Sequence, residues 1–127
     1  MSEHLDELTQ LLRNLQAQNH EIEGATVVSV QGLPIVTSMS GGLQDSVNEG
    51  IISAMTAAIL SVGDRASQEL QRGILKRILI EGEVGTIVIS QAGEHAILCV
   101  LCRNDAKLGM VFLTMQNASK KIADLLD

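Results

Sequence analysis

The longest helical pattern in the chain runs from residue 44 to residue 70. Apolar side chains recur within it at spacings of three and four residues, which is the period of one helix face. The positions on this face are Val47, Ile51, Met55, Ile59, Val62, Ala66 and Leu70. Further Ile, Leu and Ala residues widen the face beyond half the circumference, and such a helix packs against partners on more than one side. Charged residues keep its uncharged part short of the ~20 residues that span a bilayer, so direct membrane insertion is not expected.

Local signals predict where this helix begins and ends. Residues 40–42 (Ser-Gly-Gly) break the chain before it. Asp45 or Ser46 carries the side-chain oxygen expected of an N-cap. Gly73 follows the last apolar position, and glycine is favoured just past a helix end.

Two more helical patterns lie at the two ends of the sequence. Leucines mark one face of residues 3–18. A second apolar face predicts a final helix that runs to about Leu126, with Asn104 or Asp105 as its N-cap.

The remaining apolar segments are predicted strands. Residues 25–38 form a hairpin pattern, and Pro34 in its second half cannot donate to a ladder, which predicts an edge strand. Three further strands are predicted at 74–81, 86–91 and 94–102, with tight turns between them. These three are apolar on both faces, so the sheet is expected to be covered on both sides.

The element order α-β-β-α-β-β-β-α predicts an α/β (α+β) fold built as a three-layer α-β-α sandwich. Its centre is a five-stranded antiparallel sheet, with the first and last helices on one face and the long helix on the other. No linker, internal repeat or low-complexity segment interrupts the sequence, so a single domain is expected over residues 1–127.

Composition narrows the classes of partner. The net charge is −6 and Phe112 is the only aromatic residue, so neither nucleic-acid binding nor electrostatic attachment to anionic membranes is expected. The first ten residues are acidic and amphipathic and do not resemble a signal peptide. A cytoplasmic location is therefore expected, in which Cys99 and Cys102 stay reduced.

The predicted sheet is wider than its helices can cover. Five strands at ~4.8 Å spacing span about 24 Å, whereas one helix covers roughly 10 Å, so about half of the long helix's face stays open. Open apolar surface of this size marks an interface, and a second copy related by a two-fold axis would cover it. Strand 74–81 at the free edge would pair with its own copy and extend the sheet to ten strands. The alternative is that loops cover the open face. The predicted dimer interface comprises Ile51, Met55, Ala58, Ile59, Val62, Ile74, Lys76, Ile78 and Ile80.

The sequence predicts no catalytic, cofactor or metal site. The phosphate-binding pattern G-x-x-x-x-G-K-[ST] is absent, so the protein is not itself a P-loop GTPase. Cys99 and Cys102 form a C-x-x-C, but residues three apart on a strand point to opposite faces and cannot share one metal, so two core thiols are expected. No arrangement of Ser, His and Asp suggests a nucleophile, and a non-enzymatic role is predicted.

The ordered set of segments resembles the roadblock / dynein light-chain family over nearly the whole chain. The QGLP hairpin turn and the NDAKLG entry to the last helix are its most specific parts. The matching segments are GATVVSVQGLPIVTS at 24–38, GDRASQEL at 63–70, RILIEGEVGTIVIS at 77–90, HAILCVLCRNDAKLGMV at 95–111 and ASKKIADLL at 118–126.

The resemblance implies a profilin-like fold and a homodimer or a heterodimer with another roadblock subunit. It further implies a partner of Ras-like small GTPases that modulates their GTP hydrolysis or their location, as GTPase-activating partners in the family do. The alternative is a structural scaffold or light chain of a motor or membrane-associated complex, with no effect on nucleotide turnover.

A charged cluster is predicted where the long helix leads into the third strand. Arg65, Arg72 and Arg77 are the candidate contacts to a GTPase. One of them could act as an arginine finger, for which rate effects are about 10³–10⁵. The alternative is a solvated surface with pairs such as Arg65–Glu69, and activation without an arginine is the expectation.

Overall fold

The computed structural model describes residues 2–41, 43 and 47–127. Its elements confirm the predicted order α-β-β-α-β-β-β-α and the five-stranded antiparallel sheet. They are α1 (Ser2–Gln18), β1 (Ile22–Ser29), β2 (Pro34–Met39), α3 (Glu49–Glu69), β3 (Ile78–Glu81), β4 (Gly85–Gln91), β5 (Ala96–Arg103) and α4 (Leu108–Leu126).

The strand order across the sheet is β2-β1-β5-β4-β3. Pro34 is the first residue of β2, which lies at one edge, as its missing N–H predicts. β3 forms the other edge and β5 lies in the middle, paired with β1 and β4. The side chains of β5 are buried on both faces from Ala96 to Val100.

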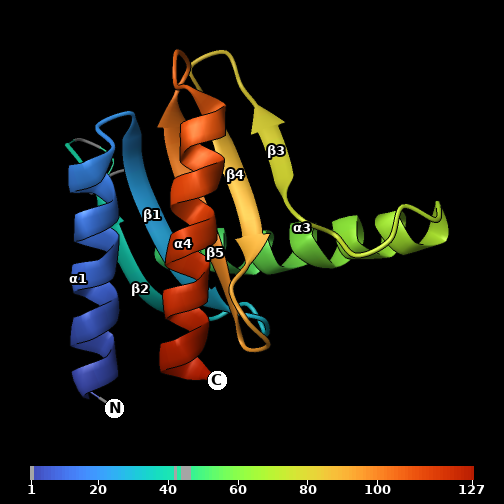
Figure 1. Cartoon of the computed structure of the whole chain (residues 1–127), viewed down its shortest axis with the longest axis horizontal. Helices are drawn as coiled ribbons and strands as arrows, with labels where there is room; N and C mark the ends of the chain where they lie inside the picture. The colour runs from blue at the N-terminus through green and yellow to red at the C-terminus, as the bar shows by residue number, and fades with distance from the viewer. Residues whose placement is uncertain (1, 42, 44–46) are drawn as a thin grey trace.

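The two faces of the sheet carry cores of different size. Figure 1 shows α1 and α4 side by side over one face, and α3 crossing behind the sheet on the other. The core under α1 and α4 is the larger, and its fully buried side chains include Leu8, Leu12, Val88, Leu98, Val111 and Ile122. The core under α3 is built on Val28, Leu60, Ile89, Ile97 and Cys99.

The start of α3 is fixed by a side-chain cap. Asn48 Oδ1 accepts a hydrogen bond of 3.0 Å from the N–H of Ile51, and the helix begins at Glu49. Asp45 and Ser46, the N-caps expected from the sequence, lie outside the described residues. At the other end Gln71 (φ 58°) and Gly73 (φ 89°) both take left-handed backbone conformations that stop the helix.

The predicted strand at 74–81 is wrong in its first half, because β3 begins only at Ile78. α3 extends past the edge of the sheet, and the chain must return along this helix before it enters β3 (Figure 1). Two hydrogen bonds hold this turn to the helix end, Arg72 N–H to Ser67 O at 2.7 Å and Ser67 Oγ to Gly73 O at 2.7 Å. Residues 74–77 are used for the return, and pairing starts at Ile78 with Ile89.

The expected cap of the last helix is also wrong. α4 begins at Leu108, and the N–H of Lys107 donates to Glu21 Oε2 at 3.1 Å, across the sheet end from β1. Asp105 instead accepts a 3.2 Å hydrogen bond from Arg103. A carboxylate distant in sequence thus accepts the hydrogen bond at the helix start, an interaction that no local pattern predicts.

The far end of α4 is tied to the turn before β5. Asp127 Oδ2 accepts a 3.0 Å hydrogen bond from the N–H of Glu94, and Asp127 Oδ1 lies 2.9 Å from His95 Nδ1. The hydrogen bond with His95 lowers the pKa of the Asp127 carboxyl. These bonds anchor the C-terminal end of α4 at the turn between β4 and β5.

Within the described part of the chain, none of the helices has both the length and the apolar character that crossing a bilayer requires.

Candidate interaction surface

An apolar stripe on α3 faces solvent. It consists of Ile51, Met55, Ala58 and Val62, at spacings of four, three and four residues. Ile51 is 58% exposed, Met55 52% and Val62 70%. The helix buries only Ser53, Thr56 and Leu60 against its own sheet. This apolar stripe is therefore the second, unpartnered face that the broad hydrophobic pattern of the helix predicts.

The sheet beside α3 is only partly covered. Ile78, Ile80 and Ile87 of β3 and β4 lie on the same face as the small core and are half-buried. Gly63 lets α3 approach this strip closely, because a Cβ there would lie 2.5 Å from Ile78 Cδ1. Beyond Gly63 no residue of the helix is buried, and Figure 1 shows this part of α3 projecting past β3. The apolar stripe and the half-buried strip form one apolar surface at the free sheet edge, whereas the projecting end of α3 beyond Gly63 is mostly charged or polar.

The structure places seven of the nine predicted interface residues along this surface, and Ile74 and Lys76 in the return segment between α3 and β3. Ile51, Met55, Ala58 and Val62 form the apolar stripe, and Ile59, Ile78 and Ile80 are half-buried beside it. Ile74 is 91% exposed in the return segment, next to the exposed Lys76. Sequence reasoning missed Gly63, whose role depends on a contact with β3 that no local pattern reveals.

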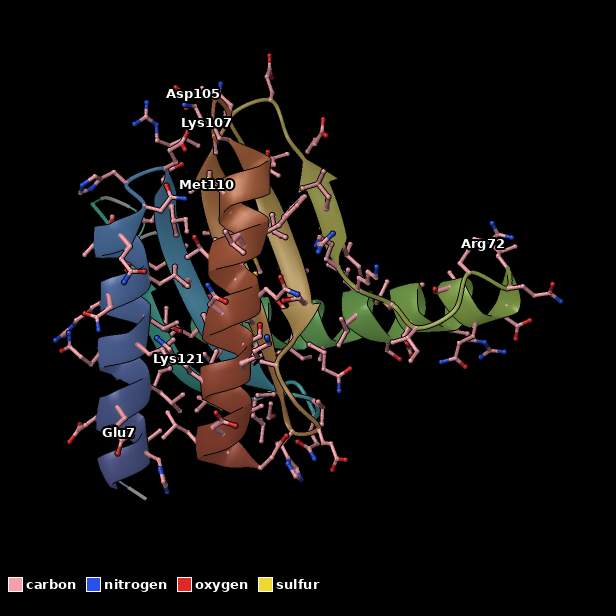
Figure 2. The ribbon with its side chains drawn as sticks, viewed as in Figure 1. Glu7, Arg72, Asp105, Lys107, Met110 and Lys121 are labelled. Atoms are coloured by element: carbon pink, nitrogen blue, oxygen red, sulfur yellow. The ribbon has the colours of Figure 1, made fainter. Side chains whose placement is uncertain are left out.

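The three predicted arginine contacts do not form one cluster. Arg65 Nε lies 4.0 Å from Glu69 Oε1, which is the expected pair on the exposed side of α3. Arg72 lies in the turn at the far end of that helix (Figure 2) and donates to Leu70 O at 3.0 Å. The guanidinium of Arg77 lies 4.4 Å from the ring centroid of Phe112 in α4, on the opposite face of the sheet. Arg65 and Arg72 therefore belong to α3 and its end, whereas Arg77 faces α4 on the other side of the sheet.

The two cysteines lie in separate cores, as their spacing predicts. Cys99 belongs to the core under α3 and Cys102 to the core under α1 and α4. Burial raises the pKa of each thiol to about 11, and for Cys102 the nearby Glu21 and Glu23 add to the effect. Within the described residues, no three His, Cys, Asp or Glu side chains are placed to hold a metal ion.

Both thiols are expected to be inert in the folded protein. At pH 8 a thiol of pKa about 11 is roughly 0.1% thiolate, and the thiolate is the reactive form. An aromatic disulfide reagent should label neither cysteine within minutes under native conditions and should label both in denaturant. Rapid release of one equivalent from native protein would contradict the buried placement of the cysteines.

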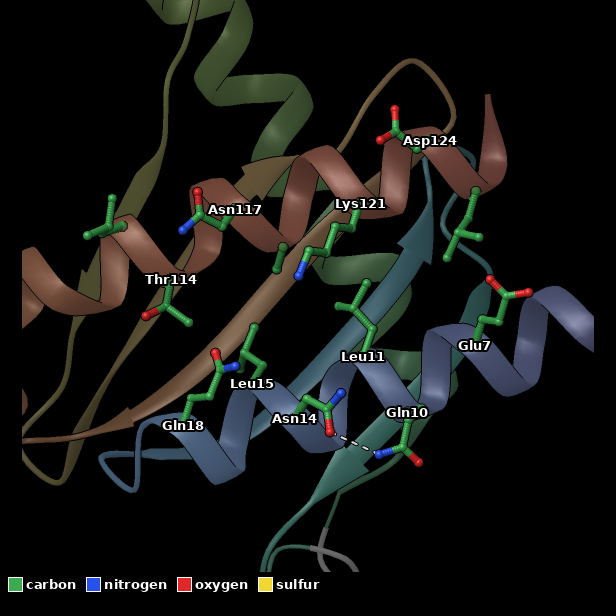
Figure 3. A pocket seen from close by; sticks show the side chains of 13 residues that line it. Glu7, Gln10, Leu11, Asn14, Leu15, Gln18, Thr114, Asn117, Lys121 and Asp124 are labelled. Carbon is green, nitrogen blue, oxygen red and sulfur yellow. Dashed lines mark hydrogen bonds between the residues drawn. The ribbon is translucent and has the colours of Figure 1, made fainter.

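A groove between α1 and α4 has a volume of about 590 Å³. Figure 3 shows Leu11 and Leu15 on the α1 side, and Lys121 reaching from α4 toward them. At the rim, Gln10 Nε2 donates to Asn14 Oδ1 at 2.9 Å. The groove mixes short apolar segments with amides and both signs of charge, so its chemistry favours no particular occupant.

Comparisons with known proteins identify a family and relatives that this chain resembles. A family model described as Roadblock/LC7 domain matches residues 8–102. The uncharacterised protein MJ1340 of Methanocaldococcus jannaschii is 36% identical over 101 residues, which cover 80% of this chain and 84% of that protein.

Solved structures share the fold at lower sequence identity. MglB in a tetrameric arrangement matches with a TM-score of 0.86 at 16% identity, covering 96% of this chain and 89% of that one. The gliding protein MglB from Thermus thermophilus matches with a TM-score of 0.85 at 17% identity, covering 96% and 90%. A profilin, solved as the LokiProfilin1/rabbit actin complex, matches with a TM-score of 0.57 at 15% identity, covering 99% and 98%. The last match confirms the profilin-like fold expected from the sequence.

Proposed function

The chain belongs to the Roadblock/LC7 domain family, and from this premise we propose that it is a non-enzymatic homodimer that binds a Ras-like small GTPase and modulates its GTP hydrolysis or its location. The observation that carries the proposal is the apolar stripe on α3, continuous with the half-buried strip of β3 and β4. A two-fold axis beside β3 would lay two α3 helices together and join two β3 edges into a sheet of ten strands.

The dimer accounts for exposed apolar groups that a monomer leaves in water. Val62 and Ile74 are 70% and 91% exposed, although large apolar side chains of this kind are usually buried. Pairing of two copies would cover them together with the projecting end of α3. The same pairing would place two copies of Arg65 and Arg72 on one platform, and such a platform suits an acidic partner surface.

The gliding protein MglB shares the fold at 17% identity, and the regulatory role is favoured here because the family that the sequence resembles includes GTPase-activating partners. A second roadblock-family subunit in place of the second copy would satisfy the same surface, and the cellular partner can be identified by pull-down from the native cell. The proposed place of action is the cytoplasm, where Ras-like GTPases work.

The test is GTP hydrolysis by a Ras-like GTPase of the same organism that is recovered by pull-down. We expect single-turnover hydrolysis to change when the protein is added, and the change to survive Arg65→Ala, Arg72→Ala and Arg77→Ala, each within about threefold. An arginine finger would instead lose about 10³–10⁵ in rate on one of these substitutions. Binding without any change in turnover or GTPase location would contradict regulation and leave the scaffold alternative.

A further inference from the structure

A second cavity, of about 430 Å³, lies between α4 and the end of β4, on the sheet face away from α3. It exists because pairing between β3 and β4 stops at Ile78 and Ile89, so Ser90 and Gln91 extend beyond the edge strand. Phe112, Met115 and other residues in the middle of α4 form its opposite wall. Of the residues that line the cavity, only Lys76 also belongs to the predicted dimer interface.

The charge of the cavity opposes that of the whole protein. Lys76, Arg77 and Lys120 line it, and none of the described Asp or Glu residues does. The chain has nine Lys and Arg against fifteen Asp and Glu. The ion pairs within the described residues involve Arg65, His95 and Arg103, and none of the three cavity cations. Three cations gathered on a concave surface without carboxylates focus a positive potential into it.

Two side chains in the cavity are arranged to meet an acceptor. The hydroxyl oxygen of Ser119 is buried and has no hydrogen-bond partner, although a helical serine commonly donates to the carbonyl four residues before it. The guanidinium of Arg77 is held over the ring of Phe112, which leaves its N–H groups for an acceptor beside the ring. An anion in the cavity would meet the guanidinium of Arg77 directly, and rotation of the Ser119 side chain would turn its shielded hydroxyl toward the same anion.

We propose that this cavity binds a small molecule bearing a phosphate group. A single carboxylate needs one cation, whereas three cations and a buried hydroxyl suit the greater charge and the additional acceptor oxygens of a phosphate. The volume falls within the range of small-molecule pockets and leaves room for an organic part against Phe112 and Met115. In this arrangement Arg77 and Lys120 contact the phosphate from the two sides of the cavity, and Ser119 donates its hydroxyl hydrogen.

The experiment is calorimetric titration of the full chain with inorganic pyrophosphate at constant ionic strength. We expect saturable binding with one site per chain, weakened at least tenfold by Lys120→Glu and several-fold by Ser119→Ala. The matched control is Lys121→Glu, which makes the same charge change on the neighbouring residue of α4 but faces the groove toward α1. That variant should bind within about twofold of the unmodified protein. Lys76 is left unchanged because it belongs to the proposed dimer interface.

Each outcome decides the proposal. Equal weakening by Lys120→Glu and Lys121→Glu would mean that only overall charge matters, and would overturn it. Absence of saturable pyrophosphate binding would do the same, and so would binding only to phosphoinositide-containing vesicles, since a free phosphate compound must suffice. If Lys120→Glu proved unfolded by circular dichroism, Ser119→Ala and Arg77→Gln would carry the test. Light scattering on the same samples keeps a failure here separate from a failure of the dimer.

Discussion

Replacing Met55 by aspartate is expected to convert the protein from a dimer into a monomer at micromolar concentration. Met55 lies at the middle of the apolar stripe on α3 and is 52% exposed in the single chain. Burying the exposed half of one methionine contributes roughly 1–1.5 kcal/mol, and a two-fold axis uses the residue twice. Loss of both contributions, with two carboxylates left in an apolar contact, should raise the dimer dissociation constant by at least about 10²-fold.

Met110→Asp is the matched control for this substitution. Met110 is also helical and is 56% exposed, but it lies at the start of α4 on the other face of the sheet (Figure 2). Static light scattering should give about twice the chain mass of 13.6 kDa for the unmodified protein and for Met110→Asp, and a single chain mass for Met55→Asp. A monomeric unmodified protein would contradict the dimer, and so would equal effects of the two substitutions.

Hydrophobic periodicity in the sequence predicts most of the fold. The helix face that includes Ile51, Met55 and Val62 is a local pattern in the sequence. Its width indicates that α3 has more apolar surface than one sheet can cover. Pro34 predicts the edge strand because its missing N–H is a property of the residue itself. Cys99 and Cys102 fall in different cores because alternation along a strand is equally local.

The features that sequence reasoning missed depend on contacts between distant segments. Glu21, in the turn before β1, accepts a hydrogen bond from the backbone at the start of α4. Gly63 has no side chain, which leaves room for Ile78. β3 is shorter than its apolar run because the chain must first return from the end of α3, and Ile74 therefore lies outside the sheet. That shortening also opens the cavity beside Ser90. A strand pattern in the sequence indicates which residues can pair, but the path of the neighbouring loop decides which of them do.

Leu98→Ala is expected to reduce the free energy of unfolding by about 3–5 kcal/mol, in the upper part of the range for buried leucines. Leu98 is fully buried in β5, and its side chain packs in the core under α1 and α4. β5 is held by β1 on one side and by β4 on the other, so its backbone cannot shift to fill the space that the substitution leaves. The cavity therefore persists, and its cost adds to the lost transfer free energy of the side chain.

Urea unfolding in the Met55→Asp background measures this change without a contribution from dimer dissociation, which would make stability depend on concentration. Leu33→Ala in the same background is the control, because Leu33 is 66% exposed in the turn before β2 and should change stability by less than about 0.5 kcal/mol. The urea dependence should stay the same in both variants, so that the shift in midpoint reports stability. A loss below about 1 kcal/mol for Leu98→Ala would mean that the core can collapse around the missing side chain. It would then contradict the argument that the central strand is fixed from both sides.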